Sequence, residues 1–308
     1  MTDAGVDRFL TCVIRRSEKD TIIRVGALIL IMIVTPVVAI LLTLDALWVY
    51  NNYIADPTEI IEFPNFVLSH LDDFAGAHMM EYSIGTYILY LVFRSYLNHC
   101  ERDLEWMDSL IAYANHKGRN TENLTNIRNK GFIEKTRRVT KCFLIWFIIV
   151  LFVCGFQAVF ISLKDMQPQL AVMTINILIF VMILQMAFTT IYIYRHIKYH
   201  TEVQHEFTTE FAKIMPEMAP KMETTECFIK DVALWKFLVP MILTFGLFSI
   251  LSTMMSIHLM NHHIRDQWVY EEKLVRRIAH EEKAVGVEKV FSDREKTLAE
   301  KVLMVFSR

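Results

Sequence analysis

Five long apolar runs constrain the fold of this chain more than any other feature of its sequence. They cover residues 22–50, 74–93, 142–163, 169–194 and 233–257. A helix needs about 17–25 apolar residues to cross the hydrocarbon core of a bilayer. Because an exposed backbone finds no hydrogen-bond partner in lipid, a continuous apolar helix is the simplest spanning structure. The runs therefore predict an all-α, polytopic transmembrane helix bundle with about five spans.

The composition agrees with this expectation. Hydrophobic residues make up 54% of the 308 residues, compared with about 45–50% in an average soluble domain. The net charge of −2 offers no bulk attraction for nucleic acid. We therefore expect the lipid bilayer, and no nucleic acid, as a partner.

The polar residues divide the chain into three parts. We expect an N-terminal cytoplasmic segment over residues 1–21, a transmembrane bundle over 22–257 with large basic loops at 94–141 and 195–232, and an amphipathic charged helical tail over 258–308. Apolar residues recur at helical spacing from Arg94 to Ala114, which predicts a helix continuing beyond the second run. A turn around Gly118 and a short helix over Phe132–Val139 should follow. Pro216 should end a helical extension of the fourth run.

The basic residues predict a cytoplasmic N-terminus. When the tail is left out, the predicted topology places twenty Lys and Arg on the same side of the membrane as the N-terminus. Only Lys164 falls on the opposite side. Lys and Arg are retained on the cytoplasmic side. Five spans would then place the equally basic tail outside, so the side of the tail is left open. We expect an integral, multi-pass protein of the plasma membrane rather than the endoplasmic reticulum.

Polar residues within spans are the first candidates for ligand or ion binding, because their burial in lipid is costly. The candidates are His78, Glu81, Gln157, Asn176 and Gln185. His78 and Glu81, one helical turn apart, could line a ligand pocket, an ion path or a proton site, or could lie wetted at the interface. Asn176 and Gln185 could instead make hydrogen bonds between helices.

Two histidine clusters support an alternative metal site. Their members are His196, His200, His258, His262 and His263. Histidines four residues apart share a helix face and could hold one metal ion. The clusters resemble the histidine boxes of membrane fatty-acid desaturases and hydroxylases, which hold two irons. The fifth span would separate the two clusters by about 30 Å, and His99 stands alone in the sequence. With no catalytic signature elsewhere, we expect no cofactor and no enzyme.

The layout of residues 90–215 resembles that of arthropod odorant and gustatory chemoreceptors. The likeness rests on Tyr90–Leu97 passing into Cys100–Trp106, and on Phe132–Val139 leading into the third run. It implies a non-enzymatic receptor or ligand-gated channel subunit for chemoreception, olfaction and signal transduction. It also implies a homo- or hetero-oligomer through loop 94–141 and tail 264–308. The chain departs from that family in having fewer spans. The alternatives are a histidine-box oxygenase and a membrane scaffold or transporter subunit.

Overall fold

A computed structural model describes residues 4–23, 71–130, 133–162, 168–220, 235–244 and 247–282. This part of the chain is helical apart from turns and an extended stretch at residues 20–23, which confirms the all-α prediction. The helices are α1 (Ala4–Ile14), α2 (Arg16–Lys19), α5 (Leu71–His116), α6 (Glu122–Asn129), α7 (Ile133–Ser162), α8 (Pro168–Ile214), α9 (Trp235–Leu243) and α10 (Leu247–Glu282).

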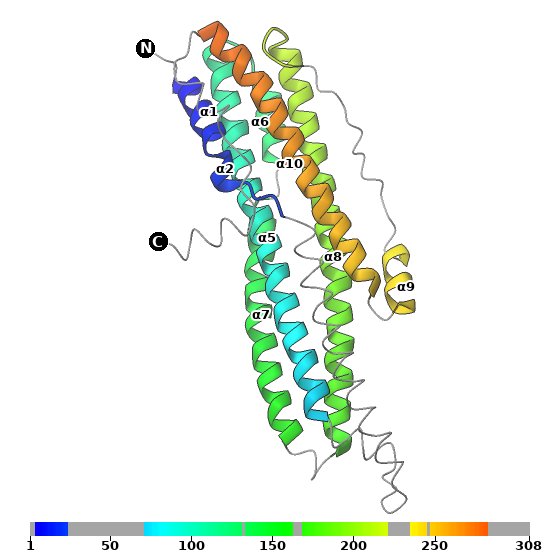
Figure 1. Cartoon of the computed structure of the whole chain (residues 1–308). Coiled ribbons are helices and arrows are strands. Elements are labelled where there is room, and N and C mark those ends of the chain that lie inside the picture. Colours follow the sequence, from blue (N-terminus) through cyan, green and yellow to red (C-terminus); the bar gives the residue numbers. More distant parts are fainter. Residues whose placement is uncertain are drawn as a thin grey trace, which may run out of the picture.

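The long helices form an elongated bundle (Figure 1). At one end, α7 lies beside the first half of α5, and α8 begins nearby. At the other end, the second halves of α5, α8 and α10 come together with α1 and α6. The described helices continue unbroken through residues 94, 141, 195 and 258, where the sequence predicted boundaries between loops, bundle and tail.

A large apolar core fills the end of the bundle that contains α1. One face of α1 contributes Val6, Phe9 and Val13, which are at most 1% exposed. They belong to the same buried cluster as Trp106 of α5 and Phe207 of α8. Val6, Phe9, Leu10 and Val13 follow the i, i+3, i+4, i+7 spacing of an amphipathic helix. The prediction of a cytoplasmic segment over residues 1–21 gave this helix no part in the core, although its apolar residues have the spacing of a core helix.

Several predictions of local structure are confirmed. Residues Arg94–Ala114 are helical within α5, and Gly118 follows with a φ of 72°, a left-handed conformation that glycine adopts without a Cβ clash. Helix α8 ends at Ile214, just before Pro216. The periodic apolar residues of the tail, among them Ile264, Trp268 and Ile278, are buried along one side of α10.

The prediction of a transmembrane bundle is wrong for the residues that the structure describes. Among them, no helix is both long enough and apolar enough to span a bilayer. Apolar residues share α5, α8 and α10 with many charged and histidine residues. The first run lies outside the described residues apart from 22–23, and the fifth is divided between α9 and α10. The multi-pass assignment, the plasma-membrane localisation, and the receptor, channel and olfaction functions attached to them therefore lose their basis.

Large apolar side chains nevertheless remain exposed on α7, including Phe152 at 68% and Phe156 at 65%. Within the described part of the chain, this face of α7 is left uncovered.

The N-terminal segment contacts the described part of the tail, residues 258–282 of α10. The Arg16 guanidinium is 2.7 Å from the Glu272 carboxylate, and α1 contacts α10 directly. The side of the tail, which the sequence left open, is thus resolved for the described residues only as contact with the N-terminal segment.

Candidate metal centre

Three histidines from three different helices converge inside the bundle. His99 comes from the middle of α5, His200 from α8 and His263 from α10. Their ring centroids are 5.2 Å apart for His99 and His200, 5.4 Å for His99 and His263, and 5.0 Å for His200 and His263. One nitrogen from each ring lies within 4.8 Å of the other two. The three imidazoles thus form a nearly equilateral triangle around a common centre.

The spacing of two of the ring nitrogens fits a tetrahedral metal site, as well as a direct hydrogen bond between the two rings. The Nε2 atoms of His99 and His200 are 3.3 Å apart. Two nitrogens that each lie about 2.0–2.1 Å from a tetrahedral zinc ion are separated by about 3.3–3.4 Å. An ion can therefore enter with little movement of these two rings.

Hydrogen bonds made by the other nitrogens orient the rings. Nδ1 of His99 lies 2.9 Å from Oδ1 of Asp20, and a carboxylate accepts the proton of that nitrogen. The Nε2 of His99 is then left with a lone pair directed at His200. Nδ1 of His263 is 3.4 Å from the Thr201 hydroxyl, whereas its buried Nε2 has no hydrogen-bond partner among the described residues. A buried nitrogen without a partner is costly, and a metal ion would satisfy it.

The surroundings keep two of the rings neutral. Burial lowers the pKa of His200 well below its usual value, and the nearby His263 and His99 lower it further. Burial likewise lowers the pKa of His263, to about 3, with His99 adding to the effect. Neutral imidazole is the form that ligates metal.

Ionised groups surround the histidines on the side of the N-terminal segment. Arg102 donates to Asp20 through Nε at 3.0 Å and to Glu271 through a second nitrogen at 2.6 Å. All three side chains are at most 1% exposed. Burial alone would raise the pKa of Asp20, but Arg102 and His99 together hold it well below the usual range. Asp20 is therefore a carboxylate that faces His99.

Asp103 is the carboxylate nearest to His200. Its Oδ2 lies 3.7 Å from Nε2 of His200. Its Oδ1 accepts hydrogen bonds from Gln204 and Gln267 at 3.1 and 2.6 Å. Two amide donors on one oxygen hold the carboxylate in place, so Asp103 is positioned to act as a fourth ligand or to accept a hydrogen bond from one.

The structure brings together part of the histidine set predicted from the sequence. His200 and His263 are in ring contact, so the expected separation of about 30 Å between the two clusters is wrong. His196 is buried but stacks on Tyr192, His262 lies 2.8 Å from Asp266, and His258 is exposed. The third ligand, His99, lies 101 residues before His200. No short spacing motif could have joined it to the others.

The residues predicted to bind a ligand within spans lie away from this cluster or outside the described side chains. His78 and Glu81 belong to the first part of α5, Gln157 to α7 and Asn176 to α8, and the side chains of these four are outside the described part of the chain. Gln185 accepts a hydrogen bond from the Trp146 indole at 2.6 Å and donates one to the Thr86 hydroxyl at 3.0 Å. These contacts fit the alternative in which Gln185 joins neighbouring helices.

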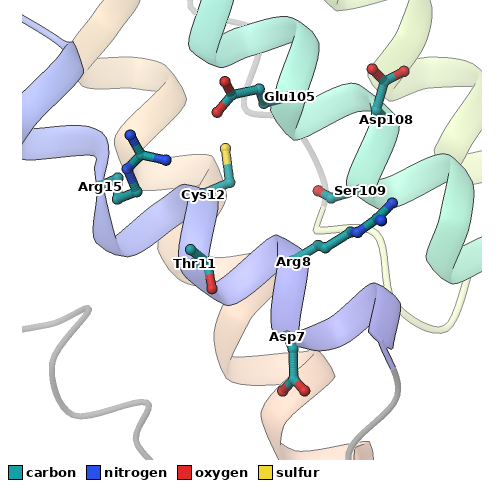
Figure 2. Close-up of a pocket in the computed structure, with 8 residues that line it drawn as sticks. All are labelled: Asp7, Arg8, Thr11, Cys12, Arg15, Glu105, Asp108 and Ser109. Carbon is teal, nitrogen blue, oxygen red and sulfur yellow. The ribbon is translucent and has the colours of Figure 1, made fainter.

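A separate open cavity of about 390 Å³ lies between α1 and α5 (Figure 2). Figure 2 shows the thiol of Cys12 between Arg15 and Glu105 at one end of this cavity, and Arg8 extended toward Ser109 at the other. Its lining carries basic and acidic side chains together, a mixture that selects no single charge of ligand.

Comparison with known proteins finds no match to any family, to any curated protein or to any solved structure. The resemblance to chemoreceptors therefore stays a prediction, and the function has to be argued from the site itself.

Proposed function

We propose that this chain binds one divalent transition-metal ion, with zinc as the expected ion, through His99, His200 and His263. The ion would fasten α5, α8 and α10 to one another near the middle of the bundle. The single observation that carries this proposal is the convergence of three imidazoles from three helices, one fully buried and two largely buried, with two Nε2 atoms at 3.3 Å.

The choice of zinc follows from the ligand set. Imidazole nitrogen suits zinc, copper, iron and nickel, whereas calcium and magnesium prefer oxygen. Three histidines around one position form a single-ion site, while the oxygenase alternative requires ligands for two irons. Zinc also accepts a carboxylate as its fourth ligand, which is the place that Asp103 can fill.

The site favours a role in holding the structure together. His99 is fully buried, and each ligand comes from a different long helix, so the ion would cross-link segments that are far apart in the chain. A ligand that binds only the folded state stabilises it by about 2.7 kcal/mol when its free concentration is 100 times its Kd. Zinc is therefore expected to raise the melting temperature of the chain.

The test is a zinc titration of the purified full chain against a chromophoric chelator, with melting curves measured in parallel. We expect one zinc ion per chain. H263A should weaken zinc binding by about 100-fold or more, because loss of even an outer-sphere partner commonly costs about 10–100-fold. Cobalt in place of zinc should give the visible absorption of a tetrahedral site, and H263A should abolish it.

H258A is the matched control. His258 lies on the same helix as His263 but is exposed, so its removal should leave the affinity unchanged. Absence of zinc binding in the wild type, or equal affinity in H263A and H258A, would overturn the proposal.

A further inference from the structure

The N-terminal segment, residues 4–23, is docked against α10 by a series of specific contacts. The Arg16 guanidinium stacks on Trp268 with 4.3 Å between Cζ and the ring centroid and pairs with Glu272. At the end of the segment, the backbone N–H of Ile23 donates to Oδ1 of Asn261, and Nδ2 of Asn261 donates to the Ile23 carbonyl, at 3.0 and 2.7 Å. The paired amide bonds hold Ile23 as a neighbouring strand would.

Asp20 connects this docked segment to the metal ligands. One of its oxygens accepts hydrogen bonds from Nδ1 of His99 and Nε of Arg102. The other accepts the Trp268 indole N–H at 2.7 Å. Asp20 therefore sits where the segment, α5 and α10 meet, and one side chain takes part in both docking and ligand orientation.

A carboxylate behind a ligating histidine has a known physical effect. It fixes the tautomer, so that the far nitrogen keeps its lone pair, and it raises the basicity of that nitrogen. Because Asp20 belongs to the N-terminal segment and the three histidines do not, this effect is present only while the segment is docked.

We propose that metal binding at His99, His200 and His263 is coupled to docking of residues 4–23. The coupling rests on the proposed metal site. An ion drawn to His99 strengthens the hydrogen bond to Asp20 and holds the segment in place, and release of the segment weakens the affinity for the ion. By thermodynamic linkage, the factor by which docking strengthens metal binding equals the factor by which the metal strengthens docking.

Release of the segment would have a large structural consequence. The buried face of α1, which includes Phe9 and Val13, would leave the core, and the buried Arg102 would lose one of its two carboxylate partners. Metal binding at this site thus controls whether the N-terminal segment stays docked against the bundle.

Cys12 reports on docking. It is only 5% exposed and its thiol contacts the Arg102 carbonyl at 3.6 Å, so although it lines the cavity between α1 and α5, its alkylation should be much faster once α1 moves away. The rate of maleimide labelling at Cys12, followed by peptide mass spectrometry, should fall at least tenfold when the wild-type chain is saturated with zinc. Cys142 is exposed on α7, and its labelling should not change. H263A should remove the effect of zinc on Cys12.

Two variants test the reciprocal effect on affinity. D20N removes the charge behind His99, and N261A removes the clamp on Ile23 without touching a ligand. D20N should weaken zinc binding by about 10–100-fold, and N261A should weaken it by at least about threefold. D7N is the matched control, because Asp7 is an acidic residue of the same segment that lines the cavity between α1 and α5.

The outcomes separate the two proposals. If the wild type binds no zinc, both fail. If zinc binds in a manner that depends on His263 but leaves Cys12 labelling unchanged, and N261A keeps the wild-type affinity, the metal site stands and the coupling is overturned. A loss of affinity in D20N alone would then mean that Asp20 acts only on the ring of His99.

Discussion

Nδ1 of His99 and Oδ1 of Asp20 lie 2.9 Å apart, although 79 residues separate them in the chain. Both side chains are fully buried. This hydrogen bond ties the middle of α5 to the end of the N-terminal segment, and it places a charged carboxylate directly behind a candidate metal ligand.

Loss of Arg102 should destabilise the fold strongly. Arg102 pairs with Asp20 and Glu271 in a fully buried cluster, so R102M leaves two buried carboxyl groups without their cation. Removal of one partner from such a cluster costs about 3–5 kcal/mol. E271Q should lower the free energy of unfolding by less, because the Asp20 carboxylate still balances the charge of Arg102. Urea unfolding of both variants measures the two losses, and equal losses would show that Glu271 matters as much as Arg102.

The face of α1 should contribute to stability as a core helix does. Phe9 is fully buried, so F9A should lower the free energy of unfolding by about 3–5 kcal/mol. Thr11 lies on the exposed side of the same helix, and T11A should change it by no more than about 0.5 kcal/mol. Similar values for the two variants, measured by urea unfolding, would mean that α1 does not pack in solution as it does here.

Gln185 should act as a link between helices. Q185L leaves the Trp146 indole N–H and the Thr86 hydroxyl without a partner. A buried unpaired group such as Thr86 costs about 1–3 kcal/mol, and the partly buried Trp146 should cost less. Adding W146F to Q185L should recover part of the loss, because it removes one of the stranded donors. The double-mutant cycle measures this recovery. Strictly additive losses would contradict the hydrogen bond between Gln185 and Trp146.

Cys12 should make the fold less stable in alkali. Burial raises the pKa of its thiol from 9.0 to about 12. Below pH 9 the thiol is protonated in both folded and unfolded chains and has no effect on the pH dependence. Between pH 9 and about 12 only the unfolded chain ionises, so stability falls by up to about 1.4 kcal/mol per pH unit.

C12A isolates this effect, because its cavity costs the same amount at every pH. The stability advantage of the wild type over C12A should be about 2 kcal/mol smaller at pH 10.5 than at pH 8, by the same linkage. Urea unfolding under reducing conditions gives both values. An advantage that does not change with pH would place the Cys12 thiol in contact with water.

Much of the local structure follows from the sequence because it depends on near neighbours in the chain. The spacing of apolar residues in Arg94–Ala114 and along the tail predicts helices, Gly118 marks a turn, and Pro216 marks a helix end. The same reasoning fails for the class of protein. The apolar runs along the chain predict membrane spans. Whether a helix can span a bilayer also depends on where that helix begins and ends, and no described helix is both long enough and apolar enough.

The candidate site could not be predicted, since each of its parts is ordinary alone. His99 has no histidine neighbour in the sequence. His200 and His263 were assigned to two different clusters on opposite sides of the predicted membrane. Asp20 lies in the predicted N-terminal segment with no local pattern that marks it as a ligand partner. The helical spacing of Val6, Phe9 and Val13 is the one local signal that could have shown the N-terminal segment packing against the bundle.

The sequence by itself therefore determined that the chain is helical, where several helices end and which faces are apolar, because these properties arise from contacts within a few residues. Only the tertiary structure decided that α5, α8 and α10 bring three imidazoles to one point, and that the N-terminal segment supplies the carboxylate behind one of them. Such contacts join residues about 60 to 250 positions apart. They exist only because helix packing offsets the entropy of closing such long loops.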